Sequence, residues 1–159
     1  MNLKTTLYSL LLIFMAFTLE HLPLPAVVEW FQPAWVMLAV ITLVFFAPHI
    51  FGYWLSIPVG LLLDVEHGTL LGLHTILVAV LIFMVQLFYR RMYMFNVVQQ
   101  ALVLFLLIVV TEILSYWSMS IISSDVRPVM IWTPALTSAF MWPWVYVVGY
   151  RTLLFLQRN

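Results

Sequence analysis

Residues 97–122 of the chain read VVQQALVLFLLIVVTEILSYWSMSII. This run of 26 residues contains one charged side chain, Glu112. It is longer than the ~20 apolar residues that a helix needs to cross the hydrocarbon core of a bilayer. We therefore predict a membrane-spanning helix over residues 97–122.

The composition of the whole chain extends this prediction beyond one helix. Of the 159 residues, 65% are hydrophobic and 8% are charged, whereas soluble domains have about 45–50% and ~25%. A soluble domain of this size could not bury so much apolar surface, and disordered chains have the opposite composition. The formal net charge is +0 and there is no cysteine, so we expect neither nucleic-acid binding nor a cysteine-held metal. The sequence predicts an integral membrane protein.

Polar breaks divide the chain into about six predicted membrane-spanning helices, which gives an all-α polytopic bundle. We treat residues 1–159 as a single transmembrane domain, with spans at about 5–19, 33–47, 50–63, 68–89, 97–122 and 133–156. The second and third spans are short and would cover only ~21–22 Å of a ~30 Å hydrocarbon core. They are either extended by their flanking residues or form a partly re-entrant hairpin.

The basic residues predict the orientation of these spans. With six spans, one side of the membrane receives five of the six Lys and Arg residues: Lys4, Arg90, Arg91, Arg151 and Arg158. The other side receives only Arg127, while the acids Glu20, Glu29, Asp64, Glu66 and Asp125 lie in or beside the loops there. Basic loops stay in the cytoplasm. We therefore predict an inner-membrane protein with both termini cytoplasmic.

Glu112 is the most informative single residue, because an ionisable side chain within the bilayer is costly and normally faces protein or water. Thr111, Ser115 and Ser118 share its helical stripe. One interpretation is a contact with a partner helix or a ligand. The other is a carboxyl group satisfied inside the bundle, which only fixes the packing of its own helix.

Small residues recur every four positions on both sides of the third polar break, at Gly52, Ser56 and Gly60 and again at Gly68 and Gly72. Such spacing lets helices pack closely in lipid, either within this chain or against a partner. Between the two series, Asp64 is expected to cap the start of the fourth helix, with glycines permitting a tight turn.

The predicted orientation places Asp64, Glu112 and Arg127 together in the outer half of the membrane. They form either a shallow polar site open to the periplasm or a capped turn with solvated charges.

The sequence contains no established catalytic motif. Among the four histidines, His67 and His74 are seven residues apart, which would place them on one face of a continuous helix. They do not resemble axial haem ligands deep on facing helices. We expect no metal, no cofactor and no enzymatic activity.

The ordered series of motifs resembles a known family. Residues 64–72, DVEHGTLLG, resemble the D-x-x-x-G-x-x-x-G pattern of MreD, the rod-shape-determining membrane protein. Residues 33–36 (PAWV), 99–103 (QQALV), 127–128 (RP) and 142–144 (WPW) match further family segments in order. The likeness runs from about residue 33 to residue 154 and agrees with the length and the span count.

This resemblance implies a non-enzymatic subunit of the bacterial elongation complex (elongasome), which supports lateral peptidoglycan synthesis and rod cell shape. Its implied partners are MreC, the glycosyltransferase RodA, a class B penicillin-binding transpeptidase and, indirectly, MreB. Candidate contact residues are Asp64, Gly68, Gly72, Glu112, Ser115 and Arg127. The family also resembles the substrate-binding S-subunits of energy-coupling-factor transporters, so the alternative function is binding of a small molecule or lipid.

Overall fold

The computed structural model describes residues 3–23, 25, 30–122 and 132–157, and these residues contain helices but no strand. The helices are α1 (Leu3–Glu20), α3 (Trp35–Phe46), a 3-10 turn η1 (Tyr53–Leu55), α4 (Ser56–His67), α5 (Leu73–Met92), α6 (Val97–Ile122) and α7 (Trp132–Gln157). The all-helical prediction is therefore confirmed for the described part of the chain.

Four of the six predicted ranges agree closely with the helices. The range 97–122 coincides with α6, and α1, α3 and α7 end within two residues of their predicted limits. Each of these limits lies where an apolar run gives way to proline or polar residues, which is where a helix loses its favourable contacts.

The third and fourth predicted ranges are wrong at the junction between them. The polar residues 64–67, predicted as a break, form the last turn of α4, which continues to His67. The chain leaves that helix at Gly68, which is left-handed with φ 60°, and α5 begins only after Gly72, which has φ 103°. Glycine takes this conformation without strain, so the turn is fixed at residues 68–72.

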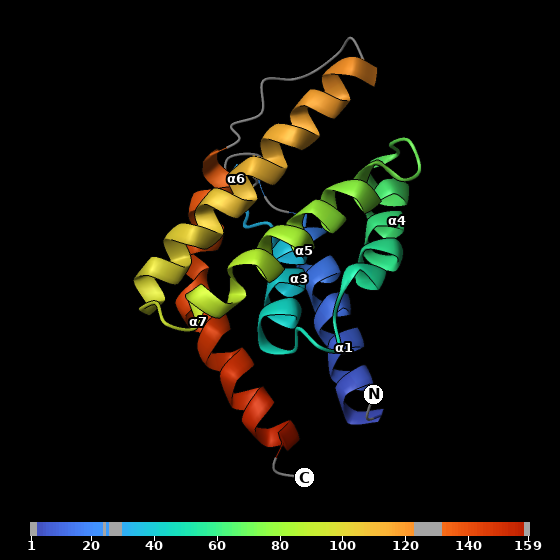
Figure 1. Cartoon of the computed structure of the whole chain (residues 1–159). Helices are drawn as coiled ribbons and strands as arrows, with labels where there is room; N and C mark the ends of the chain where they lie inside the picture. Colours follow the sequence, from blue (N-terminus) through green and yellow to red (C-terminus); the bar gives the residue numbers. More distant parts are fainter. Residues whose placement is uncertain (1–2, 24, 26–29, 123–131, 158–159) are drawn as a thin grey trace.

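The helices are arranged around α3 and α5 (Figure 1). α3 contacts α1, α5 and α7, and nine of its twelve residues are buried. α5 crosses the molecule between α4 and α6, while α6 and α7 pack side by side. The N-terminal end of α1 and the C-terminal end of α7 lie at the same end of the molecule, opposite the α4–α5 turn.

One glycine of the predicted small-residue series sets the spacing of two helices. A Cβ atom built on Gly60 would lie 2.2 Å from the Cα atom of Thr75 in α5. The backbones of α4 and α5 therefore touch at this point. At Gly60, the interpretation of close packing within the chain is correct.

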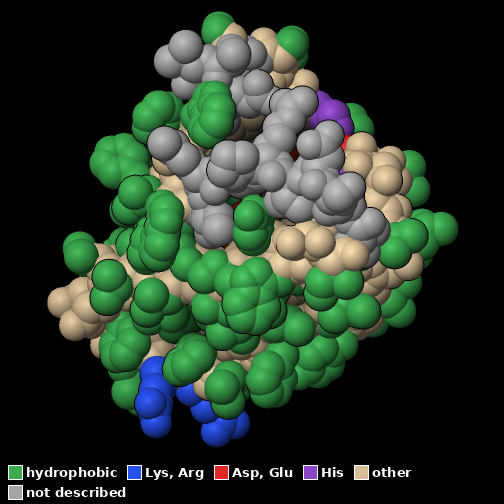
Figure 2. All heavy atoms as spheres, turned by 90° about the horizontal axis from the view of Figure 1, so that it is seen from above, with side chains coloured by type: hydrophobic (Ala, Val, Ile, Leu, Met, Phe, Trp, Pro, Cys, Tyr) green, Lys and Arg blue, Asp and Glu red, His purple; other side chains and the backbone are tan. Residues whose placement is uncertain are grey.

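The outer surface is largely apolar. Leucines 7, 10 and 11 of α1, Phe83 of α5, Leu106 of α6 and Phe140 of α7 are each more than half exposed. Outside the residues drawn in grey, Figure 2 shows mainly hydrophobic side chains, with Lys and Arg side chains gathered at one edge. Such continuous apolar patches are rare on soluble monomers and suit a lipid-facing surface.

Two helices are long and apolar enough to cross a membrane by themselves, Leu73–Met92 and Val97–Ile121. The segments Thr6–Glu20 and Trp35–Phe46 are apolar but shorter. The count of six spans therefore stays a prediction, and the short second and third spans remain its weakest part.

Candidate functional site

Asp64 organises the turn between α4 and α5. Its Oδ1 atom accepts hydrogen bonds from the backbone N–H of His74 (2.9 Å), from the His74 Nδ1 atom (2.9 Å) and from the Thr69 hydroxyl (3.0 Å). Its Oδ2 atom accepts one from the backbone N–H of Gly72 (2.6 Å). Gly72 and His74 lie at the start of α5, so Asp64, in the last turn of α4, caps the fourth predicted helix. Both oxygens of its carboxylate accept hydrogen bonds.

A second carboxylate performs the same task at another helix start. Glu20, the last residue of α1, accepts a hydrogen bond through Oε2 from the backbone N–H of Val36 (2.9 Å) in the first turn of α3. The Gln32 side chain then donates to the carbonyl oxygens of Leu19 and Glu20 (2.9 and 2.8 Å). These bonds join the end of α1 to the start of α3.

Around these caps, titratable side chains from α1, α4 and α6 and the residue that follows α1 gather at one end of the molecule. We call Glu20, His21, Glu66, His67 and Glu112 the acid–histidine cluster. His21 Nε2 lies 2.9 Å from Glu66 Oε1. Glu20 interacts electrostatically with Glu66, His67 and Glu112, and Glu112 also interacts with His67. Glu112 therefore lies near Glu20 and His67, while the grouping of Asp64, Glu112 and Arg127 in the outer half of the membrane stays a prediction.

His67 and His74 are neighbours, but they do not lie on one continuous helix as their spacing in the sequence predicted. They lie on different helices, at the end of α4 and the start of α5, because the turn at residues 68–72 interrupts the helix. Their rings nevertheless stack, with centroids 4.9 Å apart. Within the described residues, no group of three or more His, Asp or Glu side chains is arranged to hold a metal ion.

The predicted contact residues have different environments. Asp64 is 1% exposed, whereas Gly68 and Gly72 lie in the turn with open space beside them. Glu112 and Ser115 are half-buried on α6. The hydroxyl groups of Thr111 and Ser118 donate to carbonyl oxygens of α6 itself, so they do not join helices. Arg127 lies outside the described residues.

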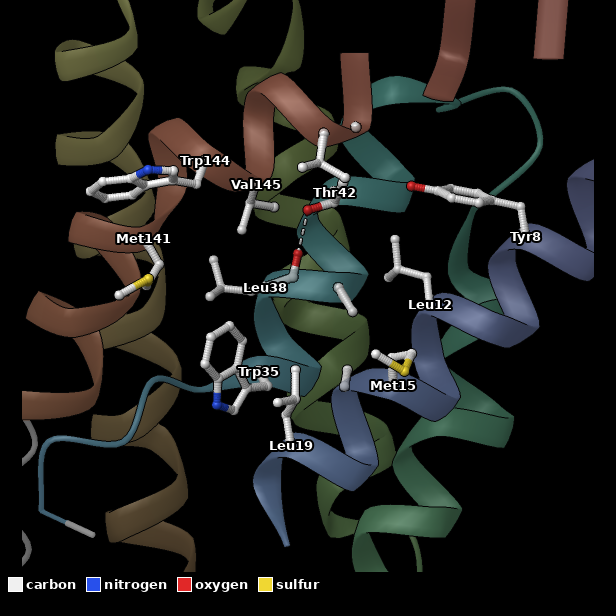
Figure 3. Close-up of a pocket in the computed structure, with 14 residues that line it drawn as sticks. Tyr8, Leu12, Met15, Leu19, Trp35, Leu38, Thr42, Met141, Trp144 and Val145 are labelled. Carbon is white, nitrogen blue, oxygen red and sulfur yellow. Dashed lines mark hydrogen bonds between the residues drawn. The ribbon is translucent and has the colours of Figure 1, made fainter. Parts of the chain in front are cut away.

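A groove that sequence reasoning missed runs between α1 and α7, with α3 as its floor (Figure 3). Its volume is about 410 Å³, and none of its lining residues is charged. Small side chains (Ala16, Ala39, Thr42 and Gly149) line its inner part, and the Thr42 hydroxyl is occupied by the Leu38 carbonyl oxygen at 2.7 Å. The remaining lining residues are Tyr8, Leu12, Met15, Leu19, Trp35, Leu38, Met141, Trp144, Val145 and Val148.

A second cavity of about 300 Å³ continues the groove towards the start of α7. It shares Trp35 and Met141 with the first and reaches Leu136 and Phe140. From Leu136 to Gly149 the groove follows α7 for about 20 Å at 1.5 Å per residue. Because this lining comes from three helices far apart in the sequence, no local pattern could predict it.

Gln100 holds the opposite end of the bundle together. Its side-chain nitrogen donates to the carbonyl oxygens of Met92 (3.0 Å) and Phe95 (3.2 Å), which satisfies the end of α5. Its side-chain oxygen accepts from the Trp142 indole N–H (3.1 Å) of α7. In the sequence, Gln100 stands out only as part of the segment 99–103 that resembles the family.

Comparison with known families decides what kind of molecule this bundle is. The family model described as rod shape-determining protein MreD matches residues 2–150. The chain belongs to the MreD family. It is therefore a membrane protein of the bacterial rod-shape machinery, in a family of shape-determining structural proteins that is not known for enzymes. No solved structure matches the chain.

Proposed function

We propose that this MreD-family chain is a non-enzymatic subunit of the elongation complex that binds the transmembrane helix of MreC in the groove between α1 and α7. Through MreC it would support the RodA and class B penicillin-binding synthase, and indirectly MreB. The observation that carries the proposal is the uncharged groove, whose floor is the most buried helix of the molecule.

The shape of the groove suits a helix. Membrane helices associate where small side chains let backbones approach closely, and Ala16 and Ala39 line the groove. Its length of about 20 Å covers much of a ~30 Å hydrocarbon core. A single-pass partner with an apolar helix fits such a surface without needing any charged contact.

Two neighbouring valines provide a matched test. Val148 lines the groove, whereas Val147 does not, although both are at least half exposed. We expect Val148→Trp to abolish copurification of MreC in mild detergent and to round the cells, because the indole fills the groove. Val147→Trp should leave both unchanged.

A photocrosslinking amino acid at the same positions tests direct contact. Position 148 should give a covalent adduct with MreC and position 147 should not. Adducts of equal yield at both positions, or rods and MreC recovery preserved in Val148→Trp, would refute the proposed groove. Normal cell shape and normal peptidoglycan synthesis after depletion of the chain would refute the function itself.

The sequence-derived contact residues enter the proposal with different roles. Gly68, Gly72, Glu112 and Ser115 remain proposed contacts of the outer end, and Arg127 with them. Asp64 is proposed to act by shaping the turn, since its carboxylate is already bonded four times. The arrangement as one transmembrane domain with both termini in the cytoplasm belongs to the same proposal.

The second candidate function, binding of a lipid or small molecule, is favoured by the volume of the groove. Binding sites for small molecules typically have ~300–1,000 Å³ and a few convergent polar groups. The groove has the volume, but its polar hydroxyl at Thr42 is already bonded, which favours an acyl chain over a polar ligand. Native mass spectrometry of the purified chain distinguishes the two: a retained lipid lost in Val148→Trp, with MreC recovery intact, would support this alternative.

A further inference from the structure

When the His21 imidazole is neutral and the Glu66 carboxylate is ionised, the pair lacks the proton that a hydrogen bond between them requires. His21 Nδ1 lies 2.8 Å from the Phe17 carbonyl oxygen, and Nε2 lies 2.9 Å from Glu66 Oε1. A carbonyl oxygen only accepts, so Nδ1 carries the hydrogen. In a neutral imidazole Nε2 then presents a lone pair, which cannot bond to a carboxylate. One additional proton, on Nε2 or on Oε1, completes the bond.

The surroundings of the pair make the His21–Glu66 contact depend on this proton. Glu66 Oε2 is buried and has no hydrogen-bond partner among the described residues, so a deprotonated pair would leave the carboxylate without any donor there. Glu66 interacts electrostatically with Glu20 on α1 and His74 on α5. The titratable groups next to these are Asp64 and His67 on α4, which interact with His74, and Glu112 on α6, which interacts with Glu20 and His67. The His21 side chain is 55% exposed and can exchange its proton with solvent.

The His21–Glu66 contact connects the end of α1 to α4, and these two helices share few other contacts. α1 packs chiefly on α3, and its end is bonded to the start of α3 through Glu20 and Gln32. Those bonds do not involve α4. α1 can therefore change its angle to α4 about this end, and the same helix forms one wall of the groove.

From this geometry we infer that the His21–Glu66 contact is a proton-dependent switch, which fixes α1 against α4 when one proton is shared and releases it when that proton is lost. Release moves α1 relative to α7 and changes the width of the groove. The switch stands on its own geometry, and only its consequence for a partner helix rests on the proposed function.

The cysteine-free chain allows a direct distance measurement. Cysteines introduced at Leu7 in α1, far from the bonded end, and at Ile57 in α4, both more than half exposed, are labelled with nitroxides in the full-length protein reconstituted in vesicles. Electron–electron resonance then gives the distance distribution between the two labels from pH 5 to pH 9. We expect a narrow peak at pH 5 that is lost at pH 9 in favour of a longer, broader distribution.

Two variants have opposite expected effects. His21→Phe removes the contact and should show the broad distribution already at pH 5. In Glu66→Gln the amide N–H donates to the Nε2 lone pair without any extra proton, so the narrow peak should persist at pH 9. The matched control His49→Gln changes an exposed histidine outside the cluster and should respond to pH like the parent.

The inference is overturned if the parent distribution does not change with pH, or if Glu66→Gln opens at pH 9 as the parent does. A response that persists in His21→Phe but disappears in His67→Gln would assign the proton to His67 and equally overturn it. Because neither MreC nor cell shape enters the measurement, its failure is distinguishable from failure of the proposed function.

Discussion

Replacing Asp64 with alanine should strongly destabilise the α4–α5 pair. The Asp64 side chain is fully buried, and its two oxygens accept four hydrogen bonds. Two of the donors are backbone N–H groups at the start of α5, which no residue of α5 itself satisfies. Alanine leaves these backbone donors without an acceptor, and the His74 ring keeps only its 3.2 Å contact with the Thr69 hydroxyl.

The expected cost follows from those contacts. A buried donor left unsatisfied costs about 1–3 kcal/mol, and removing one member of a buried pair costs about 3–5 kcal/mol. We therefore expect Asp64→Ala to lower the free energy of unfolding by about 4 kcal/mol. Asp64→Asn keeps one acceptor oxygen but turns an amide towards an N–H donor, so about 1–3 kcal/mol should be lost.

Unfolding of the purified protein in mild detergent, followed by circular dichroism during titration with SDS, measures these values. The control is Leu71→Ala, in the same turn, where the side chain is 75% exposed and the change should stay within about 0.5 kcal/mol.

An Asp64→Ala protein within about 1 kcal/mol of the parent would refute the capping role, since even a single lost cap costs about that much. If such a stable variant also lost MreC, Asp64 would be a partner contact after all.

Three further substitutions test other parts of the structure by the same unfolding measurement. Gly72→Ala should cost about 1–2 kcal/mol, because an L-residue is strained at the φ of 103° observed there; an unchanged stability would mean that the turn differs. Gly60→Ala should cost about 3 kcal/mol or more, because its methyl group would meet the backbone of Thr75, which cannot move independently of α5. Gln100→Leu should cost about 1–3 kcal/mol. In a double-mutant cycle, Gln100→Leu and Trp142→Phe should couple by at least ~0.5 kcal/mol, and additive losses would show that the indole bond contributes nothing.

The sequence predicted most helices but misplaced the turn at residues 68–72. A polar run such as residues 64–67 ordinarily marks a break, because charged side chains leave the apolar layer. Here residues 64–67 remain in the helix because their side chains find partners nearby. The Asp64 carboxylate accepts hydrogen bonds from the start of α5, and the His67 Nδ1 atom lies 2.9 Å from the Leu63 carbonyl oxygen. The two glycines, not the charges, end the helix.

The candidate site was predictable in part. Glu20, Asp64, Glu66 and Glu112 are conspicuous in so apolar a chain, and the predicted orientation already placed them towards one side. That His21 would meet Glu66, or that His67 would stack on His74 across a turn, depends on how α1, α4 and α5 are placed relative to one another. Residues 21 and 66 are far apart in the chain, and no periodicity relates them.

By itself the sequence determined that this chain is an apolar helical membrane protein of the MreD family, because length, composition and ordered local motifs are properties of the chain alone. Only the tertiary structure decided where the groove lies and which carboxylates cap which helices. In a chain whose helices are apolar on most sides, hydrophobic pattern does not specify which faces meet. That choice is made by close contacts such as Gly60 on Thr75 and by a few buried hydrogen bonds, whose partners become neighbours only when the helices pack.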